Sequence, residues 1–240
     1  MKERPAVPRQ IPLPFTAARR IDFEMFWPGA NREMVDQLRQ LASGDASRNV
    51  FLWGVPGAGK SHLLHAACNL AQASARSAAF VPLSQREVIA TDLLEGLERL
   101  DLVCIDDLDR IAGDAAWETA VFNLFNRVRE QGCRLVMASR TSPQAADLQL
   151  ADLRSRLSWD LVYHVVPLDE PSRFLALQQR ARLRGMEVPD EVLEFLSRRI
   201  GRDTHTLFDW LEKLDAASLE AKRKLTIPFV RELLAKQGSE

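Results

Sequence analysis

One glycine-rich segment of the chain strongly limits what it can fold into. Residues 54–61 read Gly-Val-Pro-Gly-Ala-Gly-Lys-Ser, which fits the pattern G-x-x-x-x-G-K-[ST] in full. Glycines let the backbone wrap around phosphate oxygens, and the helix that follows adds its positive N-terminal end. Such a loop needs a buried strand before it and a helix after it. The apolar run 50–53 and the helical pattern 60–73 supply both, so we expect an α/β domain that holds nucleoside phosphates.

The loop assigns roles to individual residues. Lys60 is expected to reach the β- and γ-phosphates, and the Ser61 hydroxyl to ligate Mg²⁺. The rest of the expected nucleotide cradle is Pro56, Gly57, Ala58, Gly59 and His62.

A second motif carries the acidic half of the same site. Residues 102–107 read Leu-Val-Cys-Ile-Asp-Asp, an apolar strand that ends in two carboxylates. Asp106 is expected to hold the Mg²⁺ shell, and Asp107 to orient or polarise the attacking water. Asp107 is one methylene shorter than the glutamate common at this position, which is consistent with weak intrinsic hydrolysis.

Apolar runs and helical periods alternate along the first two thirds of the chain. The expected strands are 50–53, 78–82, 102–105, 134–138 and 161–166. The expected helices are 31–41 before the first strand, and 60–73, 85–99 and 115–131 between the strands. This alternation predicts a parallel five-stranded sheet with helices on both faces. After Pro167 only helical patterns follow, at 170–184, 190–200, 204–221 and 228–236, with Asp169 as a cap and Pro189 as the first helical residue of two of them.

We therefore divide the chain into three parts. Residues 1–16 form a flexible proline-rich leader, residues 17–167 an α/β nucleotide-binding domain, and residues 168–240 a small all-helical lid domain.

Charge and composition limit the partners and the cellular location that we expect for the chain. The net charge of −1 disfavours nucleic-acid binding through a strongly basic surface. The sequence has no apolar run long enough to cross a bilayer and no secretory signal, so we expect no membrane partner and a cytoplasmic protein. Its three cysteines, Cys68, Cys104 and Cys133, are interpreted as reduced, buried thiols.

Several stretches together resemble one branch of the AAA+ ATPases, the branch of the replication initiator DnaA. Besides the two motifs above they are residues 26–29 (Phe-Trp-Pro-Gly), 61–68, 153–159 (Leu-Arg-Ser-Arg-Leu-Ser-Trp), 180–185 and 223–230. The similarity covers nearly the whole chain, and its strongest form is to regulators that inactivate the initiator. An initiator would continue past the lid into a helix-turn-helix domain that reads DNA, whereas we expect no duplex reader here.

The resemblance implies further site residues. Arg156 lies where the family has its arginine finger, which acts in trans on the nucleotide of a neighbouring protomer, and Arg154 is the alternative. Trp27 and Pro28 are candidates for covering the nucleotide base. Two positions depart from the family: Arg140 replaces an acidic or small polar sensor, and His205 replaces the lid arginine that touches the nucleotide. Both departures weaken the case for efficient self-hydrolysis.

The leader contains a short peptide of its own. Residues 10–15 read Gln-Ile-Pro-Leu-Pro-Phe and resemble the peptide by which bacterial proteins dock on the β sliding clamp of DNA polymerase III. Gln10 would hydrogen bond at one end of the clamp groove, and Ile11, Leu13 and Phe15 would supply its apolar contacts.

The resemblance as a whole implies a protein that binds ADP or ATP with Mg²⁺, docks on the clamp, meets DNA indirectly through it, and stimulates ATP hydrolysis by DnaA. It would thereby prevent re-initiation, acting as an activator in trans more than as a free-standing enzyme. Nucleotide-dependent self-association stays open. The first alternative is an autonomous ATPase that loads a helicase or remodels another replication protein, and the second is a nucleotide-regulated binding module.

The lid arginines are expected to form a solvated face, with clamp-borne DNA as the alternative contact; they are Arg180, Arg182, Arg184, Arg198, Arg199 and Arg202.

Overall fold

A computed structural model describes residues 21–199, 204–221 and 223–237 of the chain. Five parallel strands form one sheet in the order β2-β3-β4-β1-β5. The strands are β1 (Val50–Trp53), β2 (Ala78–Pro82), β3 (Leu102–Asp106), β4 (Arg134–Ser139) and β5 (Leu161–His164). The predicted five-stranded parallel sheet is confirmed, and β1 and β2 have the expected bounds.

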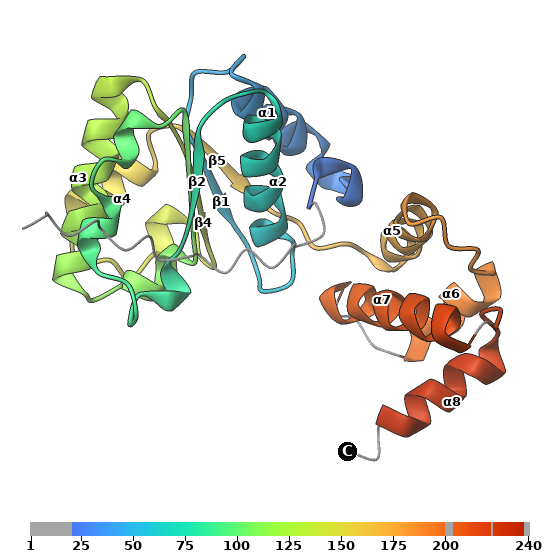
Figure 1. The fold of residues 1–240 in the computed structure, drawn as a ribbon. Helices are drawn as coiled ribbons and strands as arrows, with labels where there is room; N and C mark the ends of the chain where they lie inside the picture. The colour runs from blue at the N-terminus through green and yellow to red at the C-terminus, as the bar shows by residue number, and fades with distance from the viewer. Residues whose placement is uncertain (1–20, 200–203, 222, 238–240) are drawn as a thin grey trace, which may run out of the picture.

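Helices cover both faces of the sheet, as Figure 1 shows with the sheet seen nearly edge-on. One face carries α1 (Arg32–Ser43) and α2 (Lys60–Ala73), and the other carries α3 (Ala115–Gln131) and α4 (Ala151–Leu157). Four further helices form the lid beside this domain, namely α5 (Glu170–Leu183), α6 (Asp190–Arg199), α7 (Thr204–Ala221) and α8 (Ile227–Gln237). The expectation of a helical lid after the last strand is confirmed.

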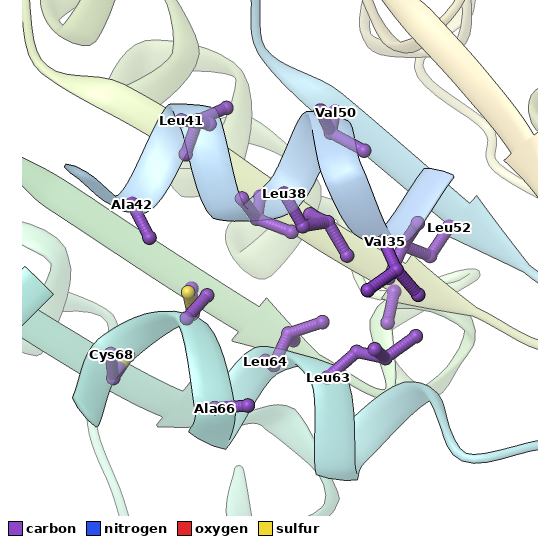
Figure 2. Close-up of a cluster of buried hydrophobic side chains, with 14 of the residues drawn as sticks. Val35, Leu38, Leu41, Ala42, Val50, Leu52, Leu63, Leu64, Ala66 and Cys68 are labelled. Carbon is purple, nitrogen blue, oxygen red and sulfur yellow. The ribbon is translucent and has the colours of Figure 1, made fainter. Parts of the chain in front are cut away.

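The two sides of the sheet build two separate cores because side chains alternate along each strand. Val50 and Leu52 of β1 pack with α1 and α2, while Phe51 packs with the helices on the other face. Figure 2 shows the first of these cores, to which α1 contributes Leu38, α2 contributes Leu64 and β1 contributes Val50 and Leu52. Leu38, Leu52 and Leu64 are fully buried.

Side-chain caps explain where several helices begin. The Asp114 carboxylate accepts a hydrogen bond from the Trp117 backbone N–H at the start of α3, and Asp169 accepts one from Ser172 at the start of α5. The predicted cap at Asp169 is therefore confirmed. Pro189 differs slightly from expectation: its carbonyl accepts the first helical bond, from Val192, so it precedes the first residue of α6.

The helix expected over 85–99 is wrong. This stretch instead holds short 3₁₀ turns at Leu83–Gln85, Thr91–Leu94 and Leu97–Arg99. Gly96 adopts a left-handed conformation with φ +80°, which interrupts any continuous helix. Leu94 is buried while Val88 is 82% exposed, so the helix-like spacing of apolar residues does not correspond to one buried face.

Among the described residues, no helix combines the length and the apolar character needed to cross a bilayer.

Candidate nucleotide site and trans-acting arginine

The phosphate-loop motif connects β1 to α2 at the carboxyl edge of the sheet. The strand order reverses at this loop. The connection through α2 runs from β1 to β2 at one edge of the sheet, whereas the connection after β4 runs to β5 at the opposite edge, and ligands of open α/β sheets bind at such a reversal. Gly59 has φ +95°, and a Cβ atom there would lie 2.7 Å from the Phe26 ring. A Cβ at Gly54 would lie 2.7 Å from the Val165 carbonyl oxygen. Close backbone approach therefore requires glycine at both positions.

Lys60 is held inside the loop that it would serve. Its side chain is largely buried, and Nζ donates hydrogen bonds to the carbonyl oxygens of Gly54 at 2.6 Å and Val55 at 3.0 Å. Burial lowers the pKa of this ammonium group, while the nearby Asp106 carboxylate opposes that shift. The Lys60 side chain is thus held against the backbone of the phosphate loop.

The two residues expected to hold a metal ion lie together. Asp106 ends β3, is 4% exposed and accepts a hydrogen bond from the Asp107 backbone N–H at 2.9 Å. Burial raises the pKa of the Asp106 carboxyl. The nearby Ser61 hydroxyl opposes that shift. A hydroxyl close to a carboxylate at the end of a phosphate loop is a donor set of the oxygen type that Mg²⁺ prefers.

Asp107 has an unusual backbone conformation. Its φ and ψ angles are 55° and 43°, a left-handed conformation that a non-glycine residue seldom adopts. Such residues cluster at functional sites, where the surrounding structure holds the strain. This conformation makes Asp107 a candidate functional residue, and its role in orienting water stays a prediction.

Arg140 pairs with a carboxylate from the short turn that follows the neighbouring strand. Arg140 follows β4, and its Nε lies 3.3 Å from Oδ2 of Asp109 while its backbone N–H donates to Oδ1 of the same residue at 3.0 Å. The sensor position therefore carries an ion pair in place of a free acidic or polar group. Sequence reasoning identified Arg140 but not Asp109, whose place just after β3 was the only signal for it.

The segment before α1 joins the phosphate loop to the lid. The His62 ring contacts the Asp22 carbonyl oxygen through Nε2 at 2.9 Å, and Gln179 of α5 donates a hydrogen bond to the Glu24 carbonyl. The Asn31 side chain bonds both the carbonyl oxygen and the N–H of Val166, each at 2.8 Å. These bonds fix the segment against the connection between β5 and the lid.

Three predicted site residues, Trp27, Pro28 and His62, lie in this segment or contact it. Trp27 and Pro28 are half-buried in the joining segment, and the Trp27 ring comes close to Gly29, whose neighbours include Leu168 and Ser172 at the start of the lid. The His62 imidazole is turned away toward Asp22, so only its backbone N–H, in the first turn of α2, faces the phosphate side. His205 begins α7, but its side chain lies outside the described residues, as do the four clamp-peptide residues Gln10, Ile11, Leu13 and Phe15.

The buried imidazole predicts a pH dependence of stability. Burial lowers the pKa of His62 from 6.5 to about 4, so the folded chain keeps the ring neutral where the unfolded chain protonates it. Stability should therefore fall as the pH drops below 6.5 and level off near 4. Between pH 7.5 and 5.0 the loss through this ring is about 2 kcal/mol.

Urea unfolding at these two pH values tests the prediction with His62→Gln as the matched variant. The glutamine amide can still donate to the Asp22 carbonyl but does not titrate. The wild type should lose about 2 kcal/mol more than the variant between pH 7.5 and 5.0. Equal losses in the two proteins would contradict a neutral, buried His62.

Arg156 lies near the amino ends of the strands, whereas the phosphate loop follows the carboxyl end of β1. It is the penultimate residue of α4, which runs into the amino end of β5, where the Leu161 N–H bonds the Asn49 carbonyl just before β1. The guanidinium carbon lies 3.8 Å from the centre of the Trp159 ring and 5.9 Å from that of Phe122. Arg156 is therefore not part of the phosphate-binding site that its own chain builds.

The lid arginines do not form one solvated face. Arg180 and Arg184 of α5 are largely buried, with side-chain exposures of 13% and 9%, and both pair with Glu212 of α7. The Arg180 guanidinium also lies over the Phe208 ring at 4.3 Å. The expectation of a solvated face is wrong for these two because their long stems pack between α5 and α7. Arg182, Arg198 and Arg199 are exposed, whereas Arg202 lies outside the described residues.

A buried carboxylate that the sequence did not single out supports α4. Glu118 of α3 is 1% exposed and accepts backbone hydrogen bonds from Gly113 at 2.8 Å, Gln149 at 3.2 Å and Leu150 at 2.7 Å. Leu150 is the residue immediately before α4. One side chain thus joins the loop before α3 to the start of the helix that carries Arg156.

Comparison with known proteins agrees with this architecture. Domain III of the Thermotoga maritima replication initiation protein DnaA superposes with a TM-score of 0.75 at 23% identity, over 90% of this chain and 96% of that one. DnaA from Aquifex aeolicus, solved with AMPPCP, gives 0.65 at 22% identity over 80% of this chain and 63% of that one. The Thermotoga maritima RuvB branch migration motor gives 0.64 at 18% identity, covering 84% and 66%. At these identities the likeness establishes the fold alone.

The sheet order, the phosphate loop and the helical lid define an AAA+ protein. Residues 18–164 match the profile of the bacterial DnaA ATPase domain, and the chain belongs to that family. Residues 170–234 match the lid domain of Hda, so this is a DnaA-like AAA+ protein with an Hda lid, a combination that belongs to the regulation of replication initiation. An ATPase domain of this family binds nucleotide.

Proposed function

We propose that the chain binds an adenine nucleotide with Mg²⁺, docks on the DNA polymerase sliding clamp through residues 10–15, and stimulates hydrolysis of ATP held by DnaA. Conversion of DnaA to its ADP form would prevent re-initiation of replication. The proposal deepens the general role that the Hda lid and the DnaA-type ATPase domain indicate.

The observation that carries the proposal is the position of Arg156. Its guanidinium lies at the amino edge of β5, whereas the chain's own phosphate loop follows the carboxyl end of β1. An arginine there is suited to complete a site on a neighbouring molecule, where it would stabilise the charge that develops on the transferred phosphoryl group. The ion pair of Arg140 with Asp109 is consistent with slow hydrolysis in the chain's own site.

Each nucleotide-site residue has a role in the proposal. Lys60 and the backbone of Pro56, Gly57, Ala58, Gly59 and His62 bind the phosphates, Trp27 and Pro28 cover the base, and His205 approaches the nucleotide from the lid. Ser61 and Asp106 hold Mg²⁺, which supplies charge neutralisation at the phosphates. Asp107 orients water in the slow intrinsic reaction.

Reconstitution tests the proposed function. DnaA loaded with labelled ATP is mixed with the chain and with clamp loaded on DNA, and the conversion of ATP to ADP is followed. We expect rapid conversion only when chain, clamp and DNA are all present, and loss of this stimulation for Gln10→Ala because the clamp peptide loses its polar contact.

The other outcomes favour the alternatives. Rapid ATP turnover by the isolated chain, abolished by Lys60→Ala and indifferent to the clamp, would indicate an autonomous remodelling ATPase. Capture of DnaA with no change in its turnover would indicate a binding module. Stimulation that is equal for wild type and Gln10→Ala would remove the clamp-docking part of the proposal.

A further inference from the structure

An exposed tryptophan lies directly against the candidate trans-acting arginine. Trp159 follows α4 and is 48% exposed, which is unusual for so large an aromatic side chain. Two guanidinium carbons lie over its ring, that of Arg156 at 3.8 Å and that of Arg129 at 4.9 Å from the ring centre. Cations placed over an aromatic face at these distances are attracted by the ring electrons.

The Arg156 guanidinium is held differently from several other arginines of the chain, which pair with carboxylates. Arg127 pairs with Glu98, Arg140 with Asp109, and Arg184 with Glu212. Within the part of the chain that the structure describes, no carboxylate pairs with Arg156, and its side-chain contacts are the faces of Trp159 and Phe122. An aromatic face can orient a guanidinium without using any of its five N–H donors.

The ring is mounted on a well-fixed turn. The Trp159 N–H donates to the Arg156 carbonyl at 3.1 Å, which brings the indole back over the arginine of the preceding turn. The next residue, Asp160, accepts a hydrogen bond from the Asn49 side chain at 3.0 Å, and the Leu161 N–H bonds the Asn49 carbonyl at 3.1 Å. These hydrogen bonds therefore fix the turn at the amino ends of β1 and β5.

We propose that Trp159 is a positioning residue for Arg156: its indole face holds the guanidinium in place while leaving all of the N–H donors free for a phosphate of the partner's nucleotide. The inference rests on the proposed function, since it concerns the same trans-acting arginine. Holding a side chain of many rotamers in one orientation before the partner arrives lowers the cost of assembling the joint site. A carboxylate partner would hold Arg156 equally well but would have to be displaced before it could act.

The test separates the maximal stimulated rate from the affinity of the complex. Variants are titrated into ATP-loaded DnaA with DNA-loaded clamp, and the maximal rate and the half-saturating concentration are fitted. We expect Trp159→Leu to lower the maximal rate at least two- to fivefold, the factor that corresponds to an exposed cation–π contact of about 0.5–1 kcal/mol. Trp159→Phe, which keeps an aromatic face, should recover most of it.

Two controls make the role specific. Arg129→Ala removes the other cation but leaves the ring over Arg156, and it should keep the wild-type maximal rate. The double variant Arg156→Ala with Trp159→Leu should be no slower than Arg156→Ala alone, because a positioning residue has nothing left to position. Thermal unfolding followed by circular dichroism verifies that each variant is folded.

The outcomes distinguish this inference from the proposed function. If Arg156→Ala abolishes stimulation while Trp159→Leu changes only the half-saturating concentration, Trp159 is an ordinary interface contact and the positioning role is wrong. Additive losses in the double variant, or a fall in maximal rate for Arg129→Ala equal to that for Trp159→Leu, overturn it as well. If Arg156→Ala itself leaves stimulation unchanged, the trans-acting role of Arg156 in the proposed function is wrong, and the positioning role of Trp159 is wrong with it.

Discussion

Replacement of Arg156 by alanine is expected to lower the stimulated hydrolysis of DnaA-bound ATP by about 10³-fold, toward the rate of DnaA alone. An arginine supplied by a neighbouring protein contributes about 10³–10⁵ in rate where such fingers have been analysed, and we expect the lower end if other parts of the partner's site still act. The residue is unpaired with carboxylates in the described part of the chain, so its loss should not expose a buried charge.

The matched control is Arg154→Ala in the same helix. Arg154 is exposed two residues before Arg156 and carries the same charge, so it reports on general electrostatic attraction between the two proteins. Single-turnover measurement of labelled ATP at saturating chain concentration, with clamp on DNA, should show wild-type turnover for Arg154→Ala. A large loss for Arg154→Ala and none for Arg156→Ala would reassign the finger to the alternative that the sequence left open.

The sequence predicted the elements whose identity depends on local pattern. The strand 50–53 and the helix 60–73 follow directly from an apolar run and a phosphate loop, and their bounds are confirmed. Asp106 and Ser61 could be paired in advance because the carboxyl ends of parallel strands meet at one edge of the sheet. The helix expected over 85–99 failed because periodicity alone does not register a glycine in a left-handed conformation at Gly96.

What the sequence could not supply depends on contacts between distant residues. The Asn31 side chain forms hydrogen bonds with the backbone of Val166, 135 residues later, and neither the residue types nor their spacing predicts this pair. The burial of Arg180 and Arg184 required knowledge that Glu212 of α7 faces α5. Trp159 stood in a stretch that carried the family resemblance, but only its distance to Arg156 suggests what it does.

Glu118 leads to the second large expected effect, on stability. Its carboxylate is buried and satisfies three backbone N–H groups, which Glu118→Ala would leave without an acceptor. Each buried donor left unpaired costs about 1–3 kcal/mol, and water entering the space left by the side chain recovers part of this. We expect Glu118→Ala to reduce the free energy of unfolding by about 3–5 kcal/mol, measured by urea denaturation at pH 7.5.

Two further variants show whether the loss comes from these hydrogen bonds. Glu118→Gln keeps an oxygen that can accept from Gly113 and Gln149 but turns an amide donor toward the Leu150 N–H, so it should lose less than Glu118→Ala. Glu130→Ala, on an exposed position of the same helix, should change stability by about 0.5 kcal/mol or less. Because Leu150 immediately precedes α4, Glu118→Gln should also lower the stimulated rate of DnaA while the protein remains folded. Equal stability of all three variants would show that the carboxylate does not anchor the helix that carries Arg156.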